Sequence, residues 1–189
     1  MAQFDILTTD NAPEGAKQRL EAAKQQLGFV PNLYGVMATS PQHLEAYQTL
    51  AGLFEASSLT PEERNTVWLT INVEHDCHYC VPAHTGIAKS QGVRDEVIEA
   101  LRENRPLPDE KLEALRQFTL KVVRQRGVVS EADTQAFFAH GYDQRTVLDV
   151  ILGVSHKVMS NYVNHFAQTP VDEGFKAFAW QPRSEAAAA

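Results

Sequence analysis

Cysteine is scarce in this sequence: two occur among 189 residues, and they lie together as Cys77 and Cys80. A disulfide between them would close a very short loop and would remove little entropy from the unfolded chain. Structural cross-linking is therefore a poor explanation for the pair. In a reducing compartment, a CxxC pair is more often catalytic, redox-sensing or metal-binding.

Long apolar runs and concentrated positive charge are also missing. No apolar run is long enough to cross a bilayer and the first residues lack the features of a secretory signal, so we expect a soluble, cytoplasmic protein without a membrane partner. The net charge is -7 and the basic residues are scattered singly, which argues against a nucleic-acid partner. The hydrophobic fraction of 43% is typical of a packed globular protein.

Alternating runs rich in β-branched residues are absent, whereas signals that start and stop helices recur along the chain. The sequence therefore predicts an all-α fold, a helical bundle. Because no linker or repeat divides the chain, we expect one domain over residues 1–180 and a disordered tail over residues 181–189.

Several helix boundaries follow from cap residues. Asn11 is expected to cap the first helix, and the Thr-Pro-Glu-Glu run at residues 60–63 predicts a capping box. Asp76 is expected to cap a helix over residues 77–90. Asp143 is expected to cap a long final helix. Its apolar spacing predicts an inward face formed by Val147, Ile151, Val154 and Val158.

Residues 74–84 read EHDCHYCVPAH, an ExxCxYCxxxH pattern that concentrates the groups needed for thiol chemistry. If Cys77 lies in the first turn of a helix, the helix dipole favours its thiolate. Cys80 follows one turn later, and His84 follows Cys80 at the i,i+4 spacing. The imidazole could then hydrogen-bond that sulfur, take its proton or stabilise the anion as imidazolium. Glu74 could relay protons, since an apolar neighbourhood would raise its pKa.

Other interpretations of these residues stay open. CxxCxxxH supplies three zinc-type ligands and His75, His78 or His165 could supply a fourth, although structural zinc sites usually draw ligands from two separated clusters. Glu74 could be a solvated carboxylate at a helix end. Asn161 and His165 lie on a predicted buried stripe, where they are either satisfied core groups or part of a pocket, and His75 and His78 are expected to be exposed.

At this segment the sequence resembles the alkylhydroperoxidase D-like family, in its peroxidase-related branch, within the carboxymuconolactone decarboxylase-like superfamily. The resemblance rests on the ExxCxYCxxxH pattern and the helix before it, and extends to VPNLY at residues 30–34 and NYVNHF at residues 161–166. It implies an all-helical fold, obligate homo-oligomers (trimers, dimers or hexamers) and antioxidant activity through the CxxC pair.

The resemblance also implies roles for individual residues. Cys80 would be the peroxidatic thiol, Cys77 its resolving partner and His84 part of the proton relay. The best-known members carry their relay glutamate where this sequence has Asn65, so Glu74 would take that role. The dipole argument favours Cys77 as the more acidic thiol, whereas the neighbouring histidine favours Cys80, and we assign Cys80. Tyr79, His78, Asn161 and His165 are expected to flank these four residues.

The sequence thus predicts a thiol-dependent hydroperoxide reductase or disulfide oxidoreductase, with a peroxiredoxin-type activity and no cofactor beyond the cysteine pair. The expected partners are a hydroperoxide or disulfide substrate and a thiol donor such as a lipoyl or thioredoxin-like protein. Two rivals remain: a redox sensor or binding module that uses the same CxxC pair without rapid turnover, and a zinc-binding structural protein.

Overall fold

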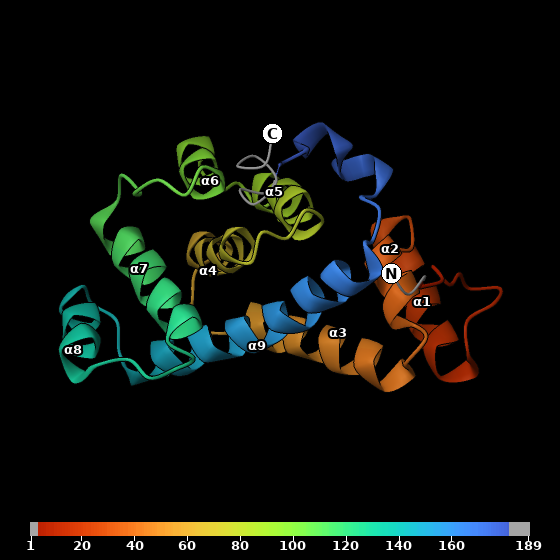
Figure 1. The fold of residues 1–189 in the computed structure, drawn as a ribbon, viewed down its shortest axis with the longest axis horizontal. Helices are drawn as coiled ribbons and strands as arrows, with labels where there is room; N and C mark the ends of the chain where they lie inside the picture. Colours follow the sequence, from red (N-terminus) through yellow and green to blue (C-terminus); the bar gives the residue numbers. More distant parts are fainter. Residues whose placement is uncertain (1–3, 182–189) are drawn as a thin grey trace.

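Residues 4–181 are described by a computed structural model, in which these residues form α-helices, one 3-10 helix and connecting loops, without a strand (Figure 1). The predicted all-α class is confirmed. Residues 1–3 and most of the predicted tail, residues 182–189, lie outside the described part. In chain order the elements are α1 (Glu14–Leu27), α2 (Asn32–Met37), α3 (Pro41–Glu55), α4 (Pro61–Glu74), α5 (Cys80–Ser90), α6 (Asp95–Arg102), α7 (Glu110–Arg124), α8 (Glu131–Ala139), α9 (Gln144–Ala167) and η1 (Glu173–Phe178).

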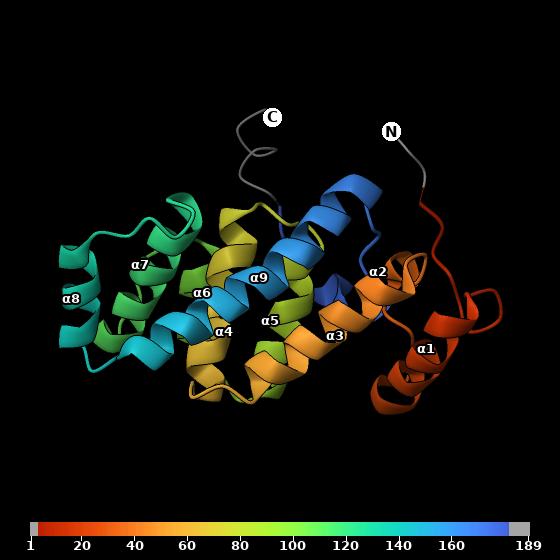
Figure 2. The same cartoon turned by 90° about the horizontal axis from the view of Figure 1, so that it is seen from below.

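Helix α4 is the centre of the bundle, because α5, α6, α7 and α9 all pack against it (Figures 1 and 2). Every residue from Asn65 to Val73 is buried, so this helix is covered on all sides. Helices α3 and α9 pack together and cross one side of α4, while α7 and α8 close one end of the molecule. None of the helices within residues 4–181 combines the length and apolarity needed to cross a membrane.

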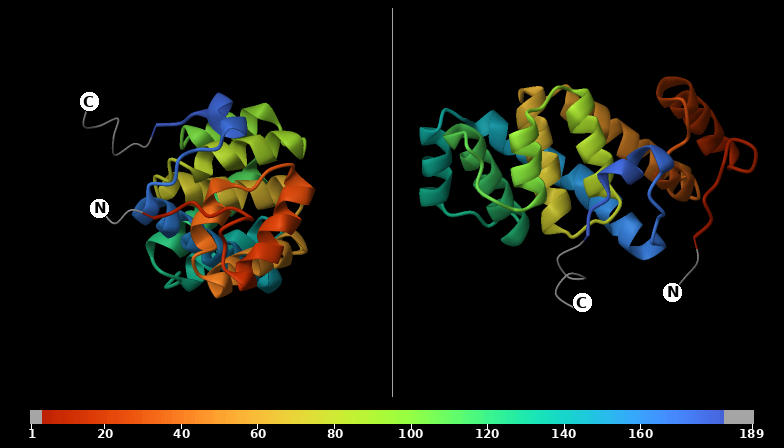
Figure 3. Two further views of the ribbon diagram at one scale, coloured as in Figure 1. Left: turned by 90° about the vertical axis from the view of Figure 1, so that its right-hand side faces the viewer. Right: turned by 90° about the horizontal axis from the view of Figure 1, so that it is seen from above.

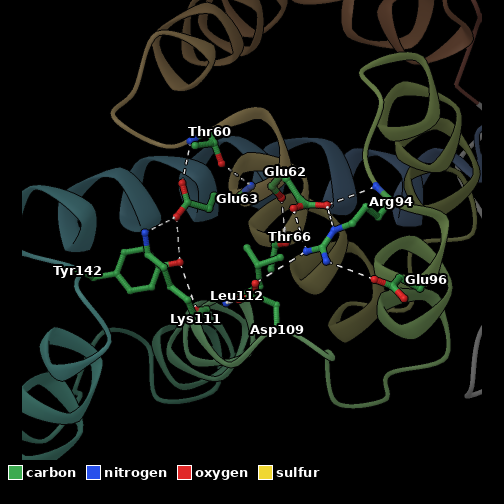
Figure 4. Close-up of polar contacts among 10 residues, drawn as sticks. All are labelled: Thr60, Glu62, Glu63, Thr66, Arg94, Glu96, Asp109, Lys111, Leu112 and Tyr142. Carbon is green, nitrogen blue, oxygen red and sulfur yellow. Dashed lines mark hydrogen bonds and ion pairs between the residues drawn. The ribbon is translucent and has the colours of Figure 1, made fainter.

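The start of α4 is fixed by a polar network (Figure 4). Thr60 forms the predicted capping box with Glu63, since each side chain binds the other residue's backbone N–H. Glu63 also accepts a hydrogen bond from the Tyr142 hydroxyl at 3.1 Å and lies 3.3 Å from Lys111 Nζ. These contacts link α4 to α7 and to the loop before α9. They therefore help to set the position of α4, the helix that precedes the cysteine pair in the chain.

Two predicted helix starts are wrong. The first helix begins after Pro13, while Asn11 accepts hydrogen bonds from Thr8 within the preceding loop. The helix predicted over residues 77–90 begins at Cys80 instead, because Asp76 has a φ of 50° and the chain makes a left-handed turn there before α5 starts. Asp76 therefore does not cap this helix, and Cys77 lies outside it.

The buried face of α9 differs from the predicted one. Ile151 is 42% exposed, and Val147, Val154 and Val158 are only partly buried. The buried positions are largely polar: Thr146, Val150, Gly153, His156, Lys157, Ser160, Asn161 and Asn164. Gly153 lies at the contact with α3, where a Cβ atom would come within 2.7 Å of the Phe54 ring. Helix α9 thus presents its polar stripe to the interior.

The segment after α9 returns over α5 as η1 (Figure 3). The rings of Phe175 and Phe178 come so close to Gly86 on α5 that a Cβ atom there would lie 3.0 to 3.2 Å from them. Arg102 of α6 donates hydrogen bonds to the carbonyl oxygens of Phe178 and Ala179. This segment therefore covers one side of the helix that carries Cys80.

Candidate redox site

The two cysteines are buried free thiols at the start of α5. Cys80 is the first residue of the helix, and Cys77 lies in the turn before it. The backbone N–H of Cys80 donates a hydrogen bond to Cys77 Sγ at 3.2 Å. Because Cys80 and not Cys77 occupies the first turn, the helix dipole now favours the Cys80 thiolate, which removes the conflict between the dipole and the neighbouring histidine.

The polar stripe of α9 surrounds Cys80. Asn164 Nδ2 lies 3.2 Å from Cys80 Sγ and 3.9 Å from Cys77 Sγ. Ser160 and Asn161, which donate hydrogen bonds to the Lys157 carbonyl oxygen and to Asn72 Oδ1, also lower the pKa of Cys80. Donors of this kind stabilise an anionic sulfur over a neutral one. Helix α9 therefore supplies a set of donors around one of the two sulfurs.

The two thiols consequently differ in acidity. Burial alone would raise the pKa of Cys80, but the Cys77 thiol, the charge of Lys157 and the α9 donors outweigh burial and lower this pKa to about 5. Burial and the neighbouring Cys80 sulfur raise the pKa of Cys77 well above its ordinary value. At neutral pH, the reduced pair is thus a Cys80 thiolate beside a Cys77 thiol.

His84 lies in the site but does not make the expected contact. Its Nε2 atom is 2.8 Å from Lys157 Nζ, and its Nδ1 atom is buried without a hydrogen-bond partner among the described residues. Neither ring nitrogen therefore hydrogen-bonds a sulfur. Burial, followed by the charge of Lys157, lowers the pKa of His84 well below its ordinary value, so the ring is neutral and does not act as imidazolium.

Glu74 lies at the end of α4 and forms a two-point ion pair with Arg124 of α7, with N–O distances of 2.7 and 2.8 Å. This contact gives Glu74 a structural role in joining two helices. The role of Glu74 in a proton relay stays a prediction. Asn65, at the position of the family's usual glutamate, is fully buried and donates hydrogen bonds to the Pro61 carbonyl and to Gln91.

Tyr79, the aromatic residue within the CxxC pair, connects the site to distant segments. Its hydroxyl donates to a carboxylate oxygen of Asp172 and accepts a hydrogen bond from the backbone N–H of Leu33. The other Asp172 oxygen accepts from the backbone N–H of Asn32 at 2.9 Å. The VPNLY segment and the segment before η1 are thus tied to the turn between the two cysteines.

The remaining predicted side chains flank the cysteine pair on the side of the chain turn. His75 Nδ1 lies 2.9 Å from Asn161 Oδ1, and His78 Nε2 lies 2.9 Å from the Thr169 carbonyl oxygen. Asn161 is fully buried, and both histidines, expected to be exposed, are half-buried, as is His165. Within residues 4–181, no three His, Cys, Asp or Glu side chains converge in a way that could hold a metal ion, so the geometry does not support the zinc alternative.

A cavity of about 380 Å³ reaches Cys80, His84 and Lys157. Its walls are mostly apolar and aromatic, and the contributing side chains include Phe29, Leu33, Tyr34, Tyr47, Ala83 and Phe175. Cys80 is only 2% exposed, so a substrate would have to enter this cavity to reach its sulfur. Cys77 does not line it. The cavity fits a small, largely apolar molecule that carries one polar reacting group.

Lys157, Ser160 and Asn164 were not predicted as site residues, although they share a helical spacing with Asn161. Together they form one polar stripe along α9, on the face that is buried. A polar stripe on an amphipathic helix ordinarily faces water, so apolar periodicity assigned the opposite face to the core. The signal was present, but the sequence alone could not show that this stripe meets the CxxC pair.

Residues 41–119 match the model of the carboxymuconolactone decarboxylase family. A search of curated protein sequences gives no significant match. Among solved structures, the chain is similar to the alkylhydroperoxidase AhpD core of an uncharacterized peroxidase-related protein from Ralstonia eutropha JMP134, with a TM-score of 0.82, 23% identity and coverage of 92% of this chain and 93% of that one. An uncharacterized peroxidase-related protein from Silicibacter sp. TM1040 gives a TM-score of 0.77, 21% identity and coverage of 92% and 95%.

The debrominase Bmp8, in complex with 2,3,4-tribromopyrrole, is also similar, with a TM-score of 0.77, 16% identity and coverage of 94% of this chain and 95% of that chain. At these identities the likeness shows the fold. The fold is therefore shared by peroxidase-related proteins and by a debrominase.

Proposed function

We propose that this protein is a thiol-dependent hydroperoxide reductase, because residues 41–119 match the model of the carboxymuconolactone decarboxylase family and the described residues have the alkylhydroperoxidase D-like fold. Cys80 is the nucleophile and Cys77 the resolving thiol. The observation that carries the proposal is the asymmetry of the pair: the acidic Cys80 lines the cavity, whereas the protonated Cys77 lies behind it. A nucleophilic cysteine must be accessible to the substrate and must be a thiolate, whereas a resolving cysteine needs only to lie close to the sulfur of the nucleophile.

In the reaction, the Cys80 thiolate attacks the distal oxygen of a hydroperoxide ROOH, so that the O–O bond breaks and a sulfenic acid and an alkoxide form. Cys77 then attacks the Cys80 sulfur, which forms the disulfide and releases water. An external dithiol, such as that of a lipoyl or thioredoxin-like protein, reduces the disulfide and restores both thiols. A protein disulfide is a second possible oxidant for the same pair. Such cycling needs a reducing compartment, which supports a cytoplasmic location.

The direct test is the hydroperoxide-dependent consumption of dihydrolipoamide. The unmodified protein should turn over repeatedly, and Cys80→Ser should abolish turnover. Cys77→Ser should still form one equivalent of sulfenic acid, trapped by dimedone, but should not cycle. Equal turnover of Cys80→Ser and the unmodified protein would contradict the proposal. Stoichiometric oxidation without turnover would instead favour the redox sensor.

A reductive dehalogenase is the second candidate, because aromatic rings line the cavity and the fold is shared with a debrominase. In that reaction the Cys80 thiolate takes the bromine of an aryl bromide, the aryl carbon gains a proton, and Cys77 displaces bromide to form the disulfide. Thiol-dependent release of bromide from a bromopyrrole, faster than consumption of any hydroperoxide, would favour this candidate over the first.

A further inference from the structure

Lys157 is a fully buried lysine at the centre of the site. Burial lowers the pKa of its amine, whereas the charges of Cys80 and Cys77 oppose that shift, so its ammonium form depends on the neighbouring sulfurs. An isolated buried charge is costly, so a lysine at this depth needs a partner. Within residues 4–181, no carboxylate oxygen forms an ion pair with its Nζ atom. Its one polar contact in that part of the chain is the 2.8 Å contact with His84 Nε2, and a neutral imidazole carries no opposite charge.

The titratable groups around this lysine come from several elements: Cys77, Tyr79, Cys80 and His84 from the turn and α5, Tyr34 from α2, Tyr47 and Glu55 from α3, and His156 from α9. Burial keeps the three tyrosines protonated, and burial together with Lys157 keeps both histidines neutral. Glu55 lines the cavity from an exposed position, and the charges that raise the pKa of Lys157 are those of Cys80 and then Cys77. The Cys80 sulfur is therefore the buried group that can balance an ammonium at neutral pH.

The charge of Lys157 decides the imidazole tautomer. An ammonium can only donate, so when Lys157 is charged His84 Nε2 accepts from it and the ring hydrogen lies on Nδ1. Nδ1 is buried and has no hydrogen-bond partner among the described residues, and His84 is one of the residues that line the cavity with Cys80. In this tautomer the ring thus has an N–H group without an acceptor among the described residues.

We propose that the Lys157 ammonium supplies the proton needed by the alkoxide that leaves when the O–O bond breaks. His84 relays this proton from Lys157 to the alkoxide oxygen. This inference rests on the proposed hydroperoxide reductase function. In the reduced protein, the ammonium of Lys157 balances the Cys80 thiolate. When the thiolate is consumed, that balance is lost, and burial then favours the neutral amine.

The step balances in atoms and charge. The Cys80 thiolate attacks the distal oxygen, the S–O bond forms, the O–O bond breaks, and the alkoxide takes the proton of His84 Nδ1 while Nε2 takes one from Lys157. The products are a sulfenic acid, an alcohol, a neutral lysine and the Nε2–H tautomer of His84. After the disulfide has formed and an external dithiol has reduced it, the proton of the regenerated Cys80 thiol passes through solvent in the cavity to His84 Nδ1, while Nε2 returns its proton to Lys157. The thiolate, the ammonium and the Nδ1–H tautomer are then all restored. Lys157 is thus a positioning residue that acts through His84.

The first experiment measures Cys80 alkylation by iodoacetamide against pH, without peroxide. Cys80 in the unmodified protein should be half-reactive near pH 5, and Lys157→Met should raise that midpoint by at least one pH unit, a tenfold decrease in the acid dissociation constant of the thiol. At pH 6 the thiolate fraction should then fall from about nine-tenths to about one half. Lys121→Met, which removes a partly exposed lysine paired with Asp133, is the matched control and should not move the midpoint. A midpoint unchanged in Lys157→Met would overturn the pairing of this lysine with Cys80.

The second experiment separates proton delivery from thiolate stabilisation. Sulfenic acid formation is timed with tert-butyl hydroperoxide, whose alkoxide needs a proton, and with peracetic acid, whose acetate does not. Loss of thiolate slows both reactions equally, whereas loss of proton delivery slows only the first. The ratio of the peracid rate to the alkyl hydroperoxide rate should therefore rise at least tenfold in Lys157→Met and in His84→Gln, and an unchanged ratio in both would refute delivery.

His84→Gln keeps the inference testable if Lys157→Met does not fold, because it retains the buried ammonium. In that variant the alkylation midpoint should stay near its original value while the rate ratio rises. A protein that reacts with neither peroxide would refute the proposed function and the delivery step together. The alkylation midpoint would then still decide whether Lys157 balances the Cys80 charge.

Discussion

At the scale of single residues, His156 is a histidine held neutral inside the bundle. Its Nδ1 atom accepts a hydrogen bond from Trp68 Nε1 at 3.1 Å, and its ring packs 4.5 Å from the Tyr47 ring. Burial, followed by the charge of Lys157, lowers the pKa of His156 to about 2. In the unfolded chain the same imidazole binds a proton below about pH 6.5. The native state does not, so acid favours unfolding.

We expect the free energy of unfolding to fall as the pH drops below about 6.5, since the unfolded state then binds the proton that native His156 excludes. The contribution of this residue approaches about 1.4 kcal/mol per pH unit once the unfolded imidazole is protonated. Urea unfolding under reducing conditions, at about pH 5.5 and about pH 4.5, checks the slope.

His156→Gln keeps an acceptor for Trp68 and should reduce that slope by about 1.4 kcal/mol per pH unit. His140→Gln, at an exposed position, is the control because it removes a histidine outside the buried cluster. Equal slopes in the His156 variant and in the unmodified protein would show that this histidine is not the source of the acid sensitivity.

At the scale of elements, α4 determines where Trp68 and Asn72 lie, and its position depends on its capped start (Figure 4). Asn72 accepts a hydrogen bond from Asn161 at 3.0 Å, so α4 also supports the α9 stripe that surrounds Cys80. A defect at the start of α4 should therefore lower stability without changing the chemistry of the thiols.

Thr60→Ala removes the oxygen that accepts from the Glu63 backbone N–H. We expect a loss of about 1 kcal/mol in the free energy of unfolding, the usual effect of deleting such a cap, measured by denaturant titration. Thr60→Ser retains the hydroxyl and should lose much less. The pH midpoint of Cys80 alkylation should be the same in all three proteins, and a shift in Thr60→Ala would mean that the cap also sets the site geometry.

At the scale of the whole molecule, the outer face of α9 carries exposed apolar side chains. Leu148, Ile151, Tyr162 and Phe166 are exposed on it, and Phe166 is 74% exposed. Side chains three or four positions apart share one face of a helix, so these residues lie along one stripe with the partly buried Val158 and Met159, with Ser155 between its two halves. Phe4 and His43 border the half that carries Tyr162 and Phe166. A second copy of the chain is the occupant we propose, in line with the homo-oligomer expected from the sequence.

The unmodified protein should therefore have a mass in solution that is a multiple of 21.0 kDa, as measured by light scattering after size-exclusion chromatography. Ile151→Glu combined with Phe166→Glu should shift it to the mass of one chain, because the interface would bury two unpaired carboxylates per copy. Val128→Glu changes an exposed apolar residue off this stripe and should leave the assembly intact. A monomeric unmodified protein at micromolar concentration would refute the proposed interface.

The prediction of fold and site from the sequence succeeded where local signals decide the outcome. The capping box at Thr60 and the cap at Asp143 are local hydrogen-bond features, and both are confirmed. The start of α5 was missed by three residues because Asp76, a residue that caps helices well, instead adopts a left-handed conformation. The α2 and η1 helices were not predicted, since each is one or two turns long and gives little periodic signal.

The sequence by itself determined the helical class and the closeness of the two cysteines, because helix propensity, caps and residue spacing act over a few neighbouring positions. Only the tertiary structure decided which face of α9 is buried, and with it the pairing of Lys157 with His84 and the donors around Cys80. The physical reason is that apolar periodicity records how much of a helix avoids water, not what covers it. A stripe covered by a second subunit and a stripe covered by the core look alike in a sequence, and a buried polar stripe looks like a solvated one.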